Sequence, residues 1–178
     1  MLRNMKLNIV LVEPEIPQNT GNIARTCAAI GAKLHLVYPL GFSISEKQVK
    51  RAGLDYWDKL EIEEHNTFND FLEKYKPEEH EMFFVTTKGK KVYSEIKYSN
   101  FDEVFLLFGK ETKGLPEDIL KKYISKTIRI PMRETLRSLN LSNSVAIVAY
   151  DVFRQTNFDG LEEISSYFDK NNWKYHWQ

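Results

Sequence analysis

Three polar segments with side chains suited to ligand binding each follow an apolar run long enough to form a strand. They are EPEIPQNTGNIAR at 13–25, FGKETKGLP at 108–116 and IPMRETLRSLNLSNS at 130–144. In open α/β sheets, ligands bind beyond the carboxyl ends of the strands. Glycine, asparagine and serine at such places present backbone amides and small hydrogen-bonding groups to a ligand. One such segment would fit a loop with a helix cap, whereas three together predict a binding site.

Several common catalytic signatures are missing from the sequence. No GxGxxG follows the first expected strand, so the usual dinucleotide-binding fingerprint is absent. The stretch GKETKG at 109–114 has the glycine spacing of a phosphate-binding loop, but Leu115 stands where that loop needs lysine. No GxSxG nucleophile elbow occurs either. The missing dinucleotide fingerprint argues against an NAD-dependent dehydrogenase.

The histidines and the cysteine give no catalytic pattern. The histidines are scattered, at 35, 65, 80 and 176, without metal-ligand spacing, so we expect no metal. Cys27 is the only cysteine and sits inside an apolar helical pattern, which is typical of a buried structural thiol. A single cysteine excludes an internal disulfide and suits a reducing compartment, so we expect a cytoplasmic protein.

Apolar runs that predict strands alternate with helical patterns along the chain. The runs lie at 7–12, 34–38, 82–87, 104–108 and 127–131, with a weaker one near 59–62. Helices are expected at about 19–30 with Gly31 as a stop, from Ser43 onward, at 67–75, from Pro116 onward, at 142–155 and at about 160–169. The alternation predicts an α/β fold with a mainly parallel sheet flanked by helices. No repeat or linker interrupts it, so we expect a single domain over residues 1–178.

The bulk composition is that of a globular protein. The 178 residues suffice for one domain with a real core, and 42% hydrophobic and 28% charged residues are ordinary values. No apolar run approaches the roughly 18 residues needed to cross a bilayer, so we expect no membrane association. The apolar stretch near the start is too short for a signal peptide, and we interpret it as a first strand.

The net charge is zero, but the charges are unevenly placed. Residues 61–81 carry eight carboxylates against two lysines, a net charge of −6, whereas 86–97 and 126–137 each carry +3. Separated charge can create an anion-binding face on a neutral protein, although an ordinary charged surface is the simpler explanation. The basic stretches supply candidates for phosphate contacts, namely Lys88, Lys90, Lys91, Arg133 and Arg137.

Three stretches of the sequence resemble the motifs of one enzyme family. PQNTGNIAR, LLFGKETKGLP and IRIPMRETLRSLNLSNSVAIVAYDVFRQ are similar, in order and spacing, to the three motifs of SpoU-type methyltransferases in the SPOUT superfamily. PLGF, KRAGLDYW and TTKG strengthen the likeness to the short tRNA ribose methyltransferases of that family. The resemblance covers about residues 6–158 and leaves an expected C-terminal helix and tail at 159–178 outside it.

The resemblance implies a fold, a cofactor and a substrate. Members of the family have an α/β fold whose C-terminal segment forms a deep trefoil knot, and they are homodimers that bind S-adenosylmethionine at the knot. They methylate a ribose 2′-hydroxyl in RNA, and the similar short members act at the wobble nucleotide, a cytidine or modified uridine at position 34, of leucine tRNAs. The implied activity is therefore tRNA 2′-O-ribose methylation. Action on another tRNA position or on rRNA is the nearest alternative, and a non-catalytic RNA-binding module with the same fold is a more distant one.

The resemblance also assigns the cofactor and substrate contacts. Val85 and Ile130, as apolar strand ends, are expected to hold the adenine through backbone bonds and packing. Gly109 and Ser138 complete the cofactor contacts, with Gly109 leaving room for close approach of the ligand. Arg137 is a candidate substrate contact because of its charge, independently of the resemblance.

Arg25 matches the arginine that the family places beside the target ribose, and we expect it to be the catalytic residue. Because arginine stays protonated in proteins, we expect Arg25 to orient a phosphate or a ribose oxygen rather than to act as a general base. Asn22 lies three residues earlier on the same helical face and is a second substrate-binding candidate.

The remaining polar residues of the motifs are expected to order the loops. Glu111 is expected to hold its loop or the sugar of the cofactor, and Asn140 to bond the backbone of the knot loop. Ser142 is well placed to cap the following helix. The apolar run 145–150 then fits a helix packed in the core and at the dimer interface.

Overall fold

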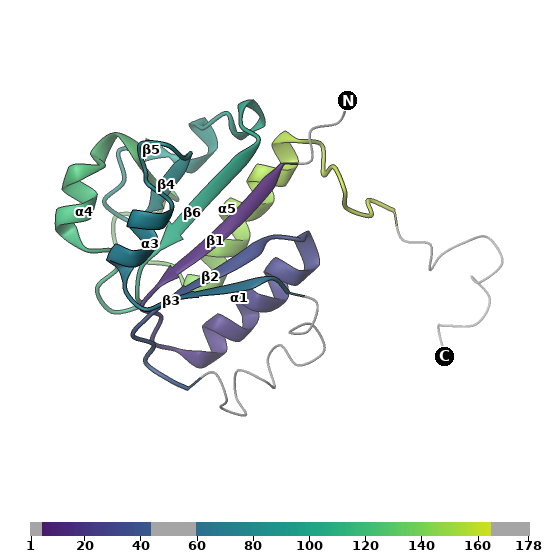
Figure 1. Ribbon diagram of the computed structural model, residues 1–178. Helices are drawn as coiled ribbons and strands as arrows, with labels where there is room; N and C mark the ends of the chain where they lie inside the picture. Colours follow the sequence, from purple (N-terminus) through teal and green to yellow (C-terminus); the bar gives the residue numbers. More distant parts are fainter. Residues whose placement is uncertain (1–4, 44–59, 165–178) are drawn as a thin grey trace, which may run out of the picture.

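The computed structural model describes residues 5–43 and 60–164, which form one parallel sheet with helices on both faces (Figure 1). The strands are β1 (Lys6–Val12), β2 (Lys33–Val37), β3 (Ile62–His65), β4 (Met82–Val85), β5 (Lys91–Val92), β6 (Glu103–Phe108) and β7 (Thr127–Arg129). Their order is β3-β2-β1-β6-β4-β7-β5, and every neighbouring pair is parallel. The predicted α/β fold with a mainly parallel sheet is confirmed.

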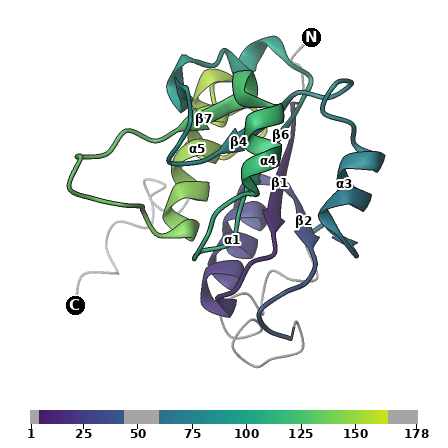
Figure 2. The same cartoon turned by 90° about the vertical axis from the view of Figure 1, so that its left-hand side faces the viewer.

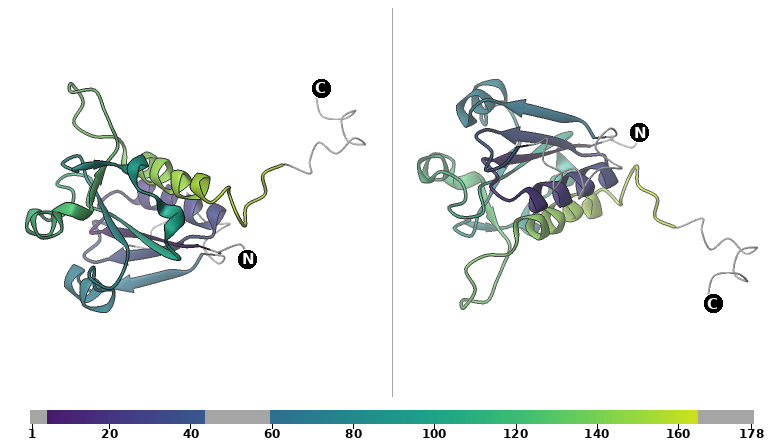
Figure 3. Two further views of the ribbon diagram at one scale, coloured as in Figure 1. Left: turned by 90° about the horizontal axis from the view of Figure 1, so that it is seen from above. Right: turned by 90° about the horizontal axis from the view of Figure 1, so that it is seen from below.

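The helices form two layers around the sheet. The pair α1 (Pro17–Ile30) and α5 (Leu141–Gln155) lie side by side on one face (Figure 3), and α3 (Phe68–Lys74) and α4 (Glu117–Lys122) cover the other (Figure 2). Short 3₁₀ helices are η2 (Tyr93–Glu95), η3 (Tyr98–Asn100) and η4 (Ile124–Lys126). In the part of the chain that the structure describes, no helix is both long and apolar enough to span a bilayer.

Alternation along the central strand divides the core into two halves. Leu7, Ile9 and Leu11 of β1 pack with α1 and α5, whereas Val10 and Val12 pack with α3 and α4. Successive side chains of a strand point to opposite faces, so a strand covered on both sides reads as one continuous apolar run. This explains why the strand segments were visible in the sequence as unbroken apolar stretches.

The ends of two helices follow local sequence signals. Helix α1 begins with Pro17 in its first turn, two residues before the predicted start, and ends at Gly31, which has the left-handed φ of 67°. Gly31 is therefore the predicted stop. Helix α3 begins at a capping box in which the Thr67 side chain accepts from the Asp70 N–H and the Asp70 carboxylate accepts from the Thr67 N–H.

Two predicted elements differ from the structure, and one lies outside it. The weak strand expected near 59–62 is β3, which begins at Ile62. No helix starts at 160, because Asn157, Phe158 and Gly160 have positive φ values of 54°, 54° and 81°, which interrupt helical geometry. Residues 160–164 are not helical, and 165–169 lie outside the described residues. The helix expected from Ser43 onward also falls outside them, at 44–59.

The strand β7 lies between two strands that are consecutive in the chain. It pairs with β4 on one side and with β5 on the other. The loop joining β4 to β5 passes close to the β7 backbone, because the Thr86 N–H donates to the Ile128 carbonyl at 2.9 Å. A Cβ atom on Gly89 would lie 2.4 Å from the Ile128 carbonyl carbon, so only glycine fits there. The strand that precedes α5 in the chain thus lies between two strands that come earlier in the sequence.

Gly109 is needed for the turn of its own loop. The loop folds back so that Lys110 and Gly114 form an antiparallel bridge, with the Gly114 N–H donating to the Lys110 carbonyl at 2.8 Å. A Cβ atom on Gly109 would lie 2.0 Å from the Gly114 carbonyl carbon and 2.1 Å from the Leu115 nitrogen. The missing side chain at this position therefore makes room for backbone atoms of the same loop.

We predict that Gly109→Ala lowers the free energy of unfolding by about 3 kcal/mol, the upper end of the range for overpacking, because backbone atoms must move. The matched control is Gly114→Ala in the same loop, where nothing lies within 4 Å and only the left-handed φ of 71° opposes alanine. That change should cost about 1–2 kcal/mol. Urea unfolding of both variants measures the difference, and equal losses would contradict backbone crowding at Gly109.

Candidate active site

A cavity of about 540 Å³ opens at the carboxyl ends of β4, β6 and β7. Val85 and Phe108, the last residues of β4 and β6, line it together with Ile130, which directly follows β7. The rest of the lining comes from the loops after these strands and from the starts of α1 and α5. The volume is within the range of about 300–1,000 Å³ that is typical of small-molecule sites.

The structure brings five of the seven predicted site residues to this cavity. The four predicted cofactor contacts Val85, Gly109, Ile130 and Ser138 all line it, and so does Arg137. Val85 ends β4, Gly109 follows β6, and the other three follow β7. Since Ile16 and Asn19 also line the cavity, it joins the three polar segments at one edge of the sheet, as their positions after strands predicted.

Asn22 and Arg25 are not among the lining residues. Both are exposed on α1, whose first turn reaches the cavity through Asn19. Arg25 lies six residues beyond Asn19, which corresponds to about 9 Å along a helix. The two predicted substrate-contacting residues of α1 thus stand apart from the cavity of their own chain.

The carboxylate of Glu111 joins the loop after β6 to the start of α1. One oxygen, Oε2, accepts from the Glu15 N–H at 2.8 Å, while Oε1 accepts from the Ile16 N–H at 3.3 Å and from the Asn19 side-chain amide at 2.9 Å. Helix α1 has no side-chain cap of its own and no acidic residue in its first turn. A negative charge is favourable at this end of a helix, so Glu111 takes the place of a local cap. The expectation that Glu111 holds its loop is confirmed.

Asn19 and Asn140 extend this network to α5. The side-chain amide of Asn140 donates to the Asn19 Oδ1 at 2.9 Å. The Asn140 Oδ1 in turn accepts from the backbone N–H groups of Ser142 and Asn143, at 2.9 and 3.3 Å. One chain of hydrogen bonds therefore runs from the loop after β6, through α1, to the first turn of α5.

The predicted cap of α5 was wrong by two residues. Asn140 is the N-cap, and Ser142 already lies inside the helix because Leu141 is its first residue. The Ser142 hydroxyl donates to the Asn140 Oδ1 at 2.7 Å instead of accepting a backbone bond. Asn140 was expected to bond the backbone of the knot loop, whereas its side chain bonds the backbone of the first turn of α5 instead.

A second contact joins the same two loops. The backbone N–H and the hydroxyl of Thr112 both donate to the Glu15 Oε2, at 3.1 and 2.8 Å. The hydrogen bond from the Thr112 side chain is the main reason that the pKa of Glu15 is lowered. Lys110 forms an ion pair with Glu13, which raises the pKa of that lysine. The loop after β6 is thus attached to the residues before α1 at several points.

The cavity rim is basic. Lys88, Lys110, Lys113 and Arg137 all contribute to its lining. Lys88 pairs with Glu117 and Lys110 with Glu13, whereas Arg137 is exposed and makes no ion pair with the described residues. Such a rim attracts a polyanion such as nucleic acid.

The sequence analysis missed Asn19 as a site residue. Asn19 is 5% exposed and lies in the first turn of α1. Its partners Glu111 and Asn140 are 92 and 121 residues away, so no local pattern could identify them.

For the cysteine the structure agrees with the sequence prediction, whereas for two of the histidines it does not. Cys27 is completely buried, and burial raises the pKa of its thiol to about 12, which confirms a structural role. The expectation that the histidines are scattered is wrong for one pair. The Nδ1 atom of His35 lies 3.0 Å from the Nε2 atom of His65, because β2 and β3 are neighbours in the sheet.

The chain and its fold are those of a SpoU-type methyltransferase. The model of the SpoU rRNA Methylase family matches residues 6–150, and the chain belongs to this family. An rRNA methyltransferase from Sinorhizobium meliloti, solved with AdoMet bound, superposes with a TM-score of 0.75 at 25% identity, over 86% of this chain and 58% of that one. The SPOUT-type arrangement predicted from the three motifs is therefore present.

Within the family, the chain is similar in sequence and in structure to enzymes that modify tRNA. The chain is 46% identical over 155 residues to the tRNA (cytidine(34)-2′-O)-methyltransferase of Escherichia coli K12, over 86% of this chain and 96% of the relative. A structure described as giving insight into the 2-OH methylation of C/U34 on tRNA has a TM-score of 0.80 at 43% identity, over 86% of this chain and 98% of that one. The predicted resemblance to the short tRNA ribose methyltransferases, the TrmL (YibK) type, is confirmed.

We predict that Glu111→Gln lowers the free energy of unfolding by about 1–3 kcal/mol, because three donors lose an ionised acceptor. Glu117→Gln is the matched control, since Glu117 makes a single ion pair with Lys88 and both side chains are over 60% exposed. The control should change stability by less than about 1 kcal/mol. Chemical unfolding of the two variants tests this, and a control as destabilising as Glu111→Gln would refute the capping role.

Proposed function

We propose that this chain is an S-adenosylmethionine-dependent tRNA 2′-O-ribose methyltransferase that acts on the wobble nucleotide, a cytidine or modified uridine at position 34. The observation that carries the proposal is the single cavity into which all four predicted cofactor contacts converge from separate segments. The names of the relatives supply the substrate class. The family resemblance adds leucine tRNAs as the proposed isoacceptors and the cytoplasm as the place of action.

The cavity fits S-adenosylmethionine in size and chemistry. Val85 and Ile130 offer strand-end backbone groups and apolar side chains that suit an adenine ring, and Leu115 adds a further apolar side chain to the wall. Ser138 and the loop after β6 offer polar groups for the sugar and the amino acid part. When bound, this cofactor supplies an electrophilic methyl group for a nucleophilic oxygen. Among the described lining residues the only carboxylate is Glu111, which is engaged by α1, so we propose methyl transfer without a metal.

The residues of the chain would act on the RNA by positioning it. Arg137 at the cavity rim, with Lys88 near it, would hold backbone phosphates. Arg25 would hold a phosphate or a ribose oxygen, and Asn22 would contact the same nucleotide. Aligning the 2′-oxygen with the reacting carbon supplies most of the rate, because correct orientation removes a large part of the entropic barrier.

We propose that the functional unit is a homodimer. Ile147 and Tyr150 on α5 are 38% and 45% exposed, which leaves apolar surface beside α1 uncovered. Asn22 and Arg25 stand on α1 outside the cavity of their own chain. A second copy packed on these helices would cover the apolar side chains and could receive Arg25 at its own cavity.

We also propose that the whole chain is one domain and that it contains a trefoil knot. The position of β7 between β4 and β5 supports the knot. The strands β4 and β5, together with the loop that joins them, would form a closed loop around β7. After β7 the chain continues to α5, which contacts η2 and η3 in the segment between β5 and β6. The end of the domain would thus pass through the loop formed by residues 85–103.

The function is tested by methyl transfer from labelled S-adenosylmethionine to unmodified total tRNA, rRNA and DNA, followed by digestion of the product to nucleosides. We expect a 2′-O-methylated pyrimidine that arises only from tRNA. Label in rRNA alone, or methylation of a base, would replace the proposed substrate by another. No transfer to any nucleic acid would count against the activity.

We predict that Arg25→Ala and Arg25→Lys both lower kcat/KM for tRNA methylation by about a hundredfold, because a displaced substrate oxygen loses its alignment. Cofactor affinity should stay unchanged, since the proposed partner of Arg25 is the RNA and not the cofactor. Steady-state kinetics and calorimetric binding of S-adenosylmethionine check the two parts. An Arg25→Lys variant with nearly full activity would contradict the proposal that the guanidinium positions the substrate through bidentate hydrogen bonds.

A further inference from the structure

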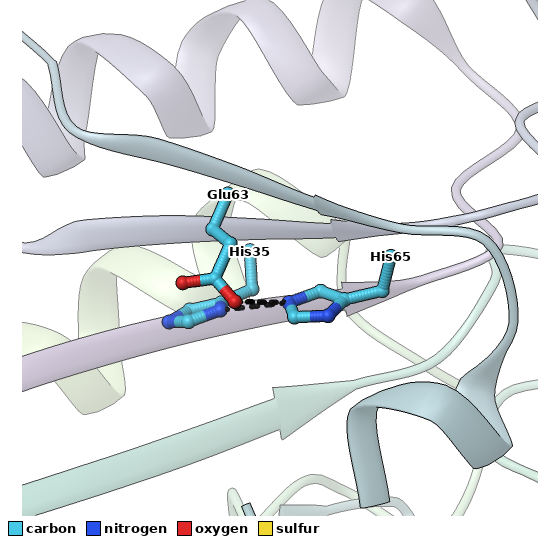
Figure 4. Close-up of side chains that lie close together, drawn as sticks. All are labelled: His35, Glu63 and His65. Carbon is cyan, nitrogen blue, oxygen red and sulfur yellow. Dashed lines mark hydrogen bonds and ion pairs between the residues drawn. The ribbon is translucent and has the colours of Figure 1, made fainter. Parts of the chain in front are cut away.

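Three side chains with metal-binding atoms meet on the face of the sheet that α3 covers, away from the cavity. His35 comes from β2, and Glu63 and His65 come from β3 (Figure 4). One ligand atom of each residue lies within 4.8 Å of the other two. Residues two apart on a strand share one face, and the parallel register places His35 opposite Glu63.

The hydrogen bonds of His35 place the lone pair of its Nδ1 toward His65, where it accepts from the His65 Nε2 at 3.0 Å and where a cation would replace this hydrogen bond. The Asn8 side-chain amide donates to Glu103 at 3.1 Å and to the Val104 carbonyl at 3.4 Å, so the Asn8 Oδ1 is an acceptor. It lies 3.1 Å from the His35 Nε2, which must therefore carry the hydrogen. The His35 Nδ1 then presents its lone pair toward His65. Metal-binding histidines commonly have such a partner on the other ring nitrogen.

Two of the three distances between the ligand atoms are close to those of a zinc site, and the third is within 4.8 Å. Two ligands at 2.0–2.1 Å from a tetrahedral zinc ion lie about 3.3 Å apart. Here the His35 Nδ1 and His65 Nε2 are 3.0 Å apart, and the His65 Nε2 and Glu63 Oε1 are 3.4 Å apart. A movement of a few tenths of an ångström would fit both pairs to one ion.

Aromatic rings enclose the two histidines. His35 is completely buried and His65 is 6% exposed. Phe71 and Tyr75 close the site with edge-on ring contacts to both histidines. The two imidazoles are therefore held in fixed positions and shielded from solvent.

Two lysines occupy the carboxylate of Glu63. The Glu63 Oε1 bonds Lys74 at 2.8 Å, and the Oε2 bonds Lys33 at 2.8 Å and the Tyr75 hydroxyl at 2.8 Å. The Lys74 side chain is 58% exposed and can leave without disturbing the core. A cation would take its place on Oε1, while Lys33 and Tyr75 would continue to orient the carboxylate.

We propose that His35, Glu63 and His65 form a zinc-binding site that joins β2 to β3. Two imidazoles and one carboxylate form a ligand set that zinc commonly uses. None of the three residues lines the cavity, so the ion would stabilise the edge of the sheet and take no part in methyl transfer. The sequence alone led us to expect no metal, and this proposal replaces that expectation. The proposal does not depend on the proposed function.

The test is a zinc titration of the full chain after chelator treatment and dialysis, with a competing metal indicator to report free zinc. We expect one equivalent of zinc per chain. Glu63→Gln should weaken binding at least tenfold. The matched control is Glu61→Gln, because Glu61 bonds the same Lys33 at 2.9 Å but lies outside the cluster. This control should bind zinc as the unmodified chain does.

A further variant keeps the result interpretable if Glu63→Gln does not fold. Lys74→Met removes the competing cation and should tighten zinc binding severalfold. The proposal is overturned by less than one equivalent of bound zinc, by equal affinities of Glu63→Gln and Glu61→Gln, or by unchanged affinity of Lys74→Met.

Discussion

The carboxylate of Glu111 is the interaction on which the geometry of the cavity depends. It accepts hydrogen bonds from two backbone amides before α1 and from the Asn19 side chain, and Asn19 passes the connection to Asn140 at the start of α5. An ionised acceptor forms stronger bonds than a neutral one, which suits a group that must hold several donors at once. These bonds fix the loop after β6, the start of α1 and the start of α5 relative to one another, although the three segments are far apart in the sequence.

This constraint explains how loops can form a site of defined shape. The lining comes largely from irregular segments after strands, which would be mobile without cross-links. The Glu15–Thr112 and Glu13–Lys110 contacts add further attachments between the same two loops, and Gly109 makes the required tight turn. The parallel sheet then supplies rigid strand ends, such as Val85, against which the loops are held. Side chains at the cavity can therefore be placed accurately although few of them lie on regular elements.

The sequence was sufficient for features that depend on neighbouring residues or on recognised motifs. Continuous apolar runs located β1, β2, β4, β6 and β7 because these strands are covered on both faces, and the motifs located Val85, Gly109, Ile130 and Ser138. Features set by distant partners could not be predicted. Asn19 gains its role from Glu111 and Asn140, and the contact between His35 and His65 needs the pairing of β2 with β3. The end of the helical structure after α5 depends on positive φ angles at non-glycine residues, for which no residue type gives a clear signal.

The position of β7 between β4 and β5 has a consequence for how the chain reaches its native state. Strands that follow each other in sequence usually become neighbours early, because closing a short loop loses little entropy. Here β4 and β5 are kept apart by a strand that is synthesised about 35 residues later, counted from Val92 to Thr127. The sheet can therefore be completed only after β7 has left the ribosome and inserted between β4 and β5. Folding of this domain is governed by contacts of long sequence separation, which makes it slow, and the cavity is among the last parts to form.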